Sequence, residues 1–280
     1  MAVTNGWGQG VINNTNGFGK LATNTIGAGS VYENSASGDT VLVAPSTPSF
    51  SNTKSVLFDG VDDFVNCGNV TTLNNATNGS WSLWIKPQAT GLKFLFSAYQ
   101  GSGPNQQIQV QKKGTGISIR LRAQGFSGGT PIMFNESSQS WTLDEWYHIA
   151  ITFDGSESDN AQKMKVYVNA NQLTNTSAGA ATTNINSTTS DFHIGSFSSS
   201  NEFAGNIDEF SIFNYTLTQA NVNTIFNSGV ANDISSLNPS HWWRMGDGDT
   251  FPTLTDNGSG SNDGTMTNMA ADDIVEDTPS

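Results

Sequence analysis

The chain has 280 residues, of which 12% are charged and 35% are hydrophobic, and its formal net charge at pH 7 is -13. An average soluble protein carries about 25% charged residues, whereas here Asn, Ser, Thr and 29 glycines supply much of the polarity. Such residues favour turns and strand edges, so the composition disfavours helical bundles and coiled coils. The 16 Phe, 7 Trp and 5 Tyr provide material for a core, which excludes wholesale disorder.

The excess of 24 acidic over 11 basic residues argues against a nucleic-acid partner, because few cations are present to displace counterions from phosphates. We interpret this excess of negative charge as a means of keeping the protein soluble, and the alternative is that acidic side chains bind calcium. The single cysteine, Cys67, excludes an internal disulfide framework, and its alternating neighbourhood predicts a small buried thiol.

Neither a membrane span nor a secretion signal is predicted. The apolar runs have the length of strands, not of membrane spans. The residues after Met1 lack the basic and apolar regions of a classical signal peptide. We therefore expect synthesis in a cytoplasm that keeps the thiol reduced.

Residues 1–45 form a Gly/Asn-rich segment that nearly repeats itself about every ten residues. Each unit places a bulky residue near paired glycines, among them Trp7, Phe18 and Tyr32, and glycine beside an aromatic ring permits close backbone approach. Such a segment cannot bury enough surface alone to offset its chain entropy. We therefore predict an extended arm that assembles with other chains through these aromatic residues; a flexible leader is the alternative. Pro45 and Pro48 indicate a linker.

Residues 55–215 alternate with the period of two that is typical of half-buried strands, and Gly/Asn/Ser turns separate the alternating runs at the spacing of a sandwich. One helix is predicted near 218–228. Thr218 is its N-cap, Val222, Ile225 and Phe226 form one face, and Gly229 ends it. The chain is therefore predicted to be all-β with one short helix.

Five motifs resemble, in order, those of laminin-G-like, concanavalin-type jelly rolls. Ser55–Val65 (SVLFDGVDDFV) is similar to the opening strand pair of that family. The other motifs are Ser80–Pro87, Asp144–Gly155, Lys165–Ala170, and Ile194–Gly195 with Phe203–Phe213. The resemblance implies a concanavalin A-like jelly-roll β-sandwich over 50–232. It implies less about function, because this fold occurs in lectins, hydrolases and adhesion modules.

Residues 233–280 contain Asn238–Asp247 and Leu254–Thr265, which resemble the strand that usually begins such a domain. Because first and last strands are neighbours in this sandwich, we expect the segment to contribute a permuted strand. A second, truncated module is the alternative. Trp242 and Trp243 are adjacent, so a strand would direct them to opposite faces.

The Gly-Trp-Gly-Gln-Gly leader, the lectin-like jelly roll and the Trp-Trp-Arg-Met-Gly-Asp-Gly tail together resemble structural proteins of tailed bacteriophages. This resemblance implies a virion component, such as a head fibre, capsid decoration or tail-fibre protein. Its arm would bind other virion proteins, its jelly roll would be available to host glycans, and analogy with phage fibres suggests a homotrimer. The rival hypothesis is a carbohydrate-binding module of a secreted bacterial protein, which the missing signal peptide disfavours.

The sequence predicts no enzyme. Glycosidases of this fold need two carboxylates about 5 to 10 Å apart, and the glucanase pattern E-x-D-x-x-E is absent. Two pairs of acidic residues come closest to this pattern. Glu157 and Asp159 lie in a turn, and Asp208 and Glu209 are adjacent and so point to opposite faces. Three histidines lie outside any metal-ligand spacing and are expected to be structural: His148, His193 and His241.

A structural calcium ion is the favoured chemistry, because Ca²⁺ binds turn carbonyls and carboxylates. The resemblance implies a site at the turn of Asp59, Gly60, Asp62 and Asp63, with Asp208 as the partner carboxylate. The alternative is that the turn aspartates cap backbone amides. Glycan binding would use aromatic rings in loop-like sequence, and the weaker candidates for this role are Tyr99, Phe126, Phe134 and Phe197.

Overall fold

The computed structural model describes residues 50–99, 106–121, 132–175, 183–197 and 201–280, together with the backbone of four short strands before residue 50. The chain divides into two compact units, Met1–Ser49 and Phe50–Ser280. In the first unit the described backbone forms two antiparallel hairpins within the predicted arm: β1 (Ala2–Thr4) with β2 (Gly10–Ile12), and β3 (Val31–Asn34) with β4 (Asp39–Leu42). Trp7 and Phe18 lie outside the described residues, and only the backbone of Tyr32 is described.

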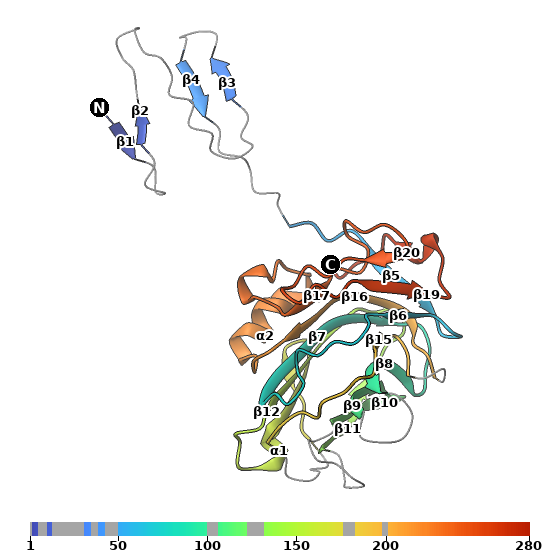
Figure 1. Ribbon diagram of the computed structural model, residues 1–280. Helices are drawn as coiled ribbons and strands as arrows, with labels where there is room; N and C mark the ends of the chain where they lie inside the picture. The colour runs from blue at the N-terminus through green and yellow to red at the C-terminus, as the bar shows by residue number, and fades with distance from the viewer. Residues whose placement is uncertain are drawn as a thin grey trace. The chain divides into compact units, whose positions relative to one another are not determined.

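The second unit is a sandwich of two antiparallel sheets (Figure 1). One sheet, here called the β16 sheet, has the strand order β14-β13-β12-β7-β16-β5-β20, and β17 also pairs with β16. Its strands are β5 (Ser55–Asp59), β7 (Asn78–Pro87), β12 (Tyr147–Asp154), β13 (Met164–Val168), β14 (Asn171–Gln172), β16 (Ala204–Phe213), β17 (His241–Trp243) and β20 (Ile274–Val275).

The other sheet, here called the β6 sheet, has the order β11-β10-β9-β8-β15-β6-β19-β18. Its strands are β6 (Phe64–Asn66), β8 (Lys93–Tyr99), β9 (Gln106–Lys112), β10 (Thr115–Leu121), β11 (Ile132–Ser140), β15 (Phe192–Ile194), β18 (Thr253–Leu254) and β19 (Gly264–Thr267). The predicted all-β jelly-roll class is therefore confirmed.

Helical structure is sparse in the described residues. It comprises α1 (Asn160–Lys163), α2 (Gln219–Phe226) and three single 3₁₀ turns: η1 (Asn227–Gly229), η2 (Ser235–Leu237) and η3 (Ala271–Asp273). None of these helices has the length and apolar character needed to cross a membrane.

The core between the sheets follows directly from the alternation in the sequence. On β12, Tyr147, Ile149, Ile151 and Phe153 point into the core, while the residues between them face outward. β7 contributes its own alternate residues in register with them: Trp81, Leu83 and Ile85. Both strands are nevertheless buried on their outer sides as well, because further structure covers the outer face of the β16 sheet.

Helix α2 provides part of that cover. Val222 and Ile225 pack in a second apolar cluster with outward residues of the β16 sheet, including Ala150 and Phe213. Thr218 is the N-cap, as predicted, and it forms a capping box with Asn221. The end differs from the prediction by two residues, because Asn227 adopts a left-handed conformation (φ 43°) before Gly229 is reached.

A β-bulge interrupts β16. Between Asp208 and Ser211 the strand advances three residues while its partner β7 advances two, from Trp84 to Ser82. The core-facing positions therefore change parity, from Ile207 before the bulge to Phe210 and Ile212 after it.

The C-terminal segment adds four short strands rather than a single permuted one. β17 pairs with the distal half of β16, and β20 pairs with β5. In the other sheet β19 pairs with β6, and β18 pairs with β19. The adjacent tryptophans separate as alternation requires: Trp243 is fully buried between the sheets, and Trp242 packs in the outer cluster.

Deletion of residues 238–280 is expected to abolish soluble expression of the sandwich. It removes Trp243 from the core and uncovers the edges of β5, β6 and β16, and uncovered edges template aggregation. Size-exclusion chromatography and circular dichroism provide the measurement. The matched control is deletion of residues 1–49, which removes a whole unit and should leave a soluble β-rich domain. A folded monomer after the C-terminal deletion would contradict the assignment of this segment to the sandwich.

Candidate functional site

The predicted calcium turn brings three carboxylates together. Oxygens of Asp59, Asp62 and Asp63 lie within 4.8 Å of one another. Gly60 makes the turn possible, because its φ is 77° and a Cβ there would stand 2.6 Å from the Cβ of Ala204. Two of the carboxylates also cap amides: Asp59 Oδ1 accepts from the amide of Val61 at 2.7 Å, and Asp63 Oδ2 accepts from that of Asp59 at 2.8 Å.

The turn is acidic enough to favour a positive partner. Burial, with added repulsion from Asp59, Asp273 and Asp62, raises the pKa of Asp63 to about 6. The donor set consists of oxygens, which suits a hard cation such as Ca²⁺. The cluster therefore fits the predicted ion chemically, although two of its oxygens are already used as caps.

Asp208 is not part of this turn. Asp59 pairs with Ala204 at the start of β16, whereas Asp208 lies four residues further along, at the bulge. Its side chain is fully buried and accepts from Asn52 Nδ2 and from the amide of Glu209, each at 2.8 Å. The structure therefore places the predicted partner carboxylate in a different, buried polar cluster.

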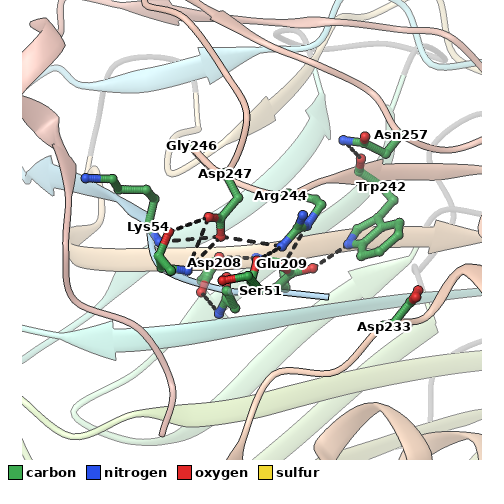
Figure 2. Close-up of polar contacts among 12 residues, drawn as sticks. Ser51, Lys54, Asp208, Glu209, Asp233, Trp242, Arg244, Gly246, Asp247 and Asn257 are labelled. Carbon is green, nitrogen blue, oxygen red and sulfur yellow. Dashed lines mark hydrogen bonds and ion pairs between the residues drawn. The ribbon is translucent and has the colours of Figure 1, made fainter. Parts of the chain in front are cut away.

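Figure 2 shows that cluster around the bulge of β16. Glu209, held at a φ of 47°, accepts hydrogen bonds from Trp242 Nε1 and, at 3.2 Å, from Arg244 Nε. The guanidinium carbon of Arg244 stands 4.5 Å from the ring centroid of Phe50, in cation–π geometry. The bulge thus turns an acidic side chain toward a cation and an indole supplied by the C-terminal segment.

The same cluster ties down the strand that enters the sandwich. Arg244 donates to the carbonyl of Ser51 and lies 3.5 Å from Asp247 Oδ2. Asp247 accepts from the amide and hydroxyl of Thr53 and from the amide of Lys54. Residues 51–54 are therefore bound by C-terminal side chains before β5 begins.

Burial dominates the electrostatics of the acidic pair. It raises the pKa of both Asp208 and Glu209, and repulsion from Glu209 adds to the rise for Asp208. Arg244 opposes the rise for Glu209. Through the hydrogen bonds from Asn52, Trp242 and Arg244, the pair links β16 to the segments that pack on it.

A hydroxyl–imidazole–carboxylate chain is also present. His241 Nε2 lies 2.6 Å from Thr72 Oγ1, and His241 Nδ1 lies 2.7 Å from Asp256 Oδ2. The imidazole is 1% exposed and stacks on Trp243. Asp256 also accepts backbone hydrogen bonds from residues 242, 258 and 262. The chain therefore organises the loop around the imidazole, and solvent does not reach its proton-transfer atoms.

The other two predicted structural histidines differ in environment. His148 is fully buried, its Nε2 lies 2.8 Å from Ser82 Oγ, and burial lowers its pKa to about 3. His193 is part-buried on the outer face of the β6 sheet, where burial lowers its pKa and nearby Asp191 opposes that shift.

The outer face of the β6 sheet carries polar side chains in register. One row crosses neighbouring strands directly opposite one another: Thr265, Asn66, His193, Ser97 and Gln109. One tilted ring pair includes His193 of this row, and one stacked ring pair lies on the same face. Phe64 lies beside His193 at a centroid distance of 4.7 Å, and Phe94 beside Phe197 at 4.5 Å.

At the β6–β19 end this face is hollowed into a shallow polar depression of about 510 Å³. Asn66, Thr265 and Thr267 come from the paired strands β6 and β19. Asp191 lines it from the approach to β15, and Asp263 from the loop before β19. The remaining lining residues are Cys67, Gly68, Ser261 and Asn262. Hydroxyls, amides and carboxylates of this kind bind polyhydroxylated ligands.

Of the four predicted glycan-contacting aromatics, Phe197 is the one whose side chain is described, and it lies on this outer face. Tyr99 pairs with Gln106 and Phe134 with Ile119, with only their backbones described; Phe126 lies outside the described residues. Sequence reasoning missed the depression. The alternation around Val65 and Cys67 marks Phe64 and Asn66 as outward, but their proximity to Asp263 depends on the pairing of Asn66 with Thr265, which is distant in sequence.

A two-layer antiparallel jelly roll with a polar outer face is the architecture of concanavalin A-like lectin domains. The model of the Laminin_G_3 family, described as the concanavalin A-like lectin/glucanases superfamily, matches residues 59–223. The chain belongs to this family. No curated protein sequence matches the chain.

Solved structures resemble parts of the chain at low sequence identity. A protein from Bacteroides ovatus ATCC 8483 is 14% identical, with a TM-score of 0.55 over 86% of this chain and 67% of the other. A heptameric SAP-like pentraxin from Limulus polyphemus is 17% identical (TM-score 0.47, 62% and 82% covered). The CBM40 of the Ruminococcus gnavus IT-sialidase is 11% identical (TM-score 0.44, 62% and 96% covered). At 14% identity the likeness to the Bacteroides ovatus protein shows the fold alone.

Replacing Arg244 with Met is expected to lower the free energy of unfolding by about 3 kcal/mol at pH 8, because it leaves buried Glu209 without its cation. At pH 8 the unpaired carboxylate of Glu209 either stays ionised in a site without water or takes up a proton. Both states cost free energy and destabilise the folded variant. Near pH 4 this carboxylate is already neutral in the folded state, so the loss should shrink as pH falls. Urea denaturation at both pH values measures the difference.

The control is Lys165→Met, which breaks a partly exposed ion pair with Glu157 at 3.8 Å and should change stability by less than about 1 kcal/mol. An equal effect of Arg244→Met at both pH values would show that lost packing on Phe50, and not the charge pair, accounts for the change.

Proposed function

We propose that this chain is a non-enzymatic, glycan-binding structural protein and that the outer face of the β6 sheet is its binding surface. The observation that carries the proposal is the accessible β6–β19 end of that face, where Thr265, Asn66 and His193 lie in register. Phe64 packs beside His193 there, whereas Ser97 and Gln109, further along the row, are buried. Amides bind sugar hydroxyls, and rings pack against sugar faces. The Bacteroides ovatus protein of similar fold is described as a candidate carbohydrate binding protein, which supports the proposal at the level of the fold.

The proposed absence of catalysis rests on the environments of the acidic groups. A glycosidase needs a general acid with a pKa raised by burial beside a second carboxylate. The buried pair Asp208–Glu209 borders none of the described depressions. In the polar depression Asp263 is exposed, and Asp191 is tied to Asn66 Nδ2 at 3.1 Å. Binding of sugar without cleavage is the outcome these groups support.

The proposed place of the protein is the virion of a tailed phage, as a head fibre, capsid decoration or tail-fibre component. The resemblance of the leader and tail to phage structural proteins supports this setting. The separation of Met1–Ser49 as a compact unit of its own is consistent with an assembly segment joined to a displayed sandwich. The rival remains a carbohydrate-binding module of a secreted bacterial protein.

Particles of a phage that carries this gene are expected to contain the chain in stoichiometric amount, because an assembly unit would bind it to other virion proteins. Mass spectrometry of gradient-purified particles provides the measurement. The control is a gene lacking codons 2–49, whose product should be made but absent from particles. Absence of the intact chain from particles, with secretion by a bacterial host, would favour the rival.

We further propose a structural Ca²⁺ at the Asp59–Asp63 turn. Three carboxylates share that turn, and burial, with added repulsion from neighbouring carboxylates, raises the pKa of Asp63 to about 6. A divalent cation would relieve this repulsion and fix the loop that joins β5 to β6. Asp59, Asp62 and Asp63 would hold it, and Asp208 would not participate.

Adding millimolar CaCl₂ to EDTA-treated protein is expected to raise the Tm at pH 7.5 by about 3 °C. The sign depends on pH. The pKa of Asp63 is about 6 in the folded protein, against an ordinary value of 3.8. The contribution of this group to the free energy of unfolding therefore falls as the pH rises from about 4 to 6. The cation then replaces the proton, so the calcium effect should be small at pH 4.5 and full above pH 6.5.

Differential scanning fluorimetry measures both conditions. Asp62→Asn should remove the calcium effect, while Glu145→Gln, an equal charge change at an exposed turn outside the cluster, should retain it. An unchanged Tm with calcium would leave the three aspartates as turn caps only.

A further inference from the structure

The depression at the β6–β19 end of the outer face has an unusual charge for a sugar site. Its lining includes two carboxylates, Asp191 and Asp263, and no lysine or arginine. The imidazole beside it, His193, has its pKa lowered by burial, so it is neutral at pH 7. The described lining therefore provides hydrogen-bond acceptors in excess and no positive charge.

Each carboxylate keeps an oxygen free for a ligand. Asp191 Oδ2 accepts from Asn66 Nδ2 at 3.1 Å, and Asp263 Oδ1 accepts from the amide of Asp256 at 2.9 Å. No hydrogen bond within the described residues reaches the second oxygen of either group. These internal contacts hold both side chains in place, and a preorganised acceptor loses less entropy when a ligand binds.

An aromatic surface stands next to these acceptors. Phe64 precedes Asn66 at the same-face spacing of two residues on β6, and it is only partly buried. Its ring lies beside His193, the register partner of Asn66. A sugar ring on Phe64 would thus place its hydroxyls near Asn66 and the carboxylates.

We propose that this depression is the primary sugar subsite and that it selects neutral sugars, with hydroxyls donating to Asp191 and Asp263 and a ring face on Phe64, while it rejects sialylated and sulfated glycans. The selectivity follows from charge. A carboxylate accepts strongly from a hydroxyl, whereas an anionic sugar brought to the same oxygens meets repulsion without a compensating cation. The inference rests on the proposed glycan binding and adds its place and ligand class.

The experiment uses the full chain on an array that contains neutral glycans and their sialylated or sulfated counterparts, followed by calorimetric titration of the tightest neutral oligosaccharide and its sialylated form. We expect the neutral member of each pair to bind at least fivefold more tightly. Raising the salt concentration should narrow this ratio, because screening weakens the repulsion.

Asp263→Asn tests the site with little change of shape, since the amide oxygen can still accept from the backbone of Asp256. It should weaken neutral-sugar binding about fivefold and reduce the discrimination against the sialylated form. Phe64→Ala should weaken both forms alike. Glu145→Gln, with the same charge change at an exposed turn, should alter neither value.

The outcomes separate the inference from the function beneath it. Preferential binding of anionic glycans, or neutral binding unchanged by Asp191→Asn and Asp263→Asn, would overturn the subsite while leaving a glycan-binding protein. Binding to no glycan on the array, or release of cleaved sugar, would overturn the proposed function itself.

Discussion

The pairing of β16 with two different partners along its length is the interaction on which the rest of the sandwich depends. Its first half pairs with β5 and its second half with β17, and β7 runs along its other side. The strand that opens the domain and a strand from the C-terminal segment therefore share one neighbour. The β-bulge at Asp208–Glu209 lies where one partner gives way to the other, and it keeps core-facing side chains inward on both sides.

The bulge has an energetic cost, which its surroundings offset. It holds Glu209 at a positive φ and buries two adjacent carboxylates, an arrangement that desolvation disfavours. Arg244, Trp242 and Asn52 supply the hydrogen bonds that make it tolerable. Buried charge pairs of this kind add little net stability, but they penalise wrong arrangements, since any other register leaves a carboxylate unpaired. The acidic pair thus specifies how the C-terminal segment docks.

The sequence predicts those parts of the fold that depend on local pattern. Period-two alternation identifies β7 and β12, and the capping residue Thr218 locates the start of α2. What alternation cannot supply is the number of residues at a bulge or the partner of a strand that is distant in sequence. Ile207 and Phe210 are three apart, which signals a change of parity, yet only the register with β7 shows that Asp208 leaves the acidic turn. The depression fails to appear in the sequence for the same reason, because β6 meets β19 through long-range pairing.

The acidic residues of this chain do three different things, and their neighbours decide which. Where Asp208 and Glu209 are dry and bonded to amides, an indole and a guanidinium, negative charge positions strands. Where Asp59, Asp62 and Asp63 share a turn, negative charge favours the binding of a proton or a cation. Where Asp191 and Asp263 stand in a wet depression with one oxygen bound and one free, it offers acceptors to hydroxyl groups. The net charge of -13 alone therefore does not indicate which ligands the protein binds. Its distribution is informative, because only the third setting combines access to solvent, a fixed acceptor and an adjacent aromatic ring.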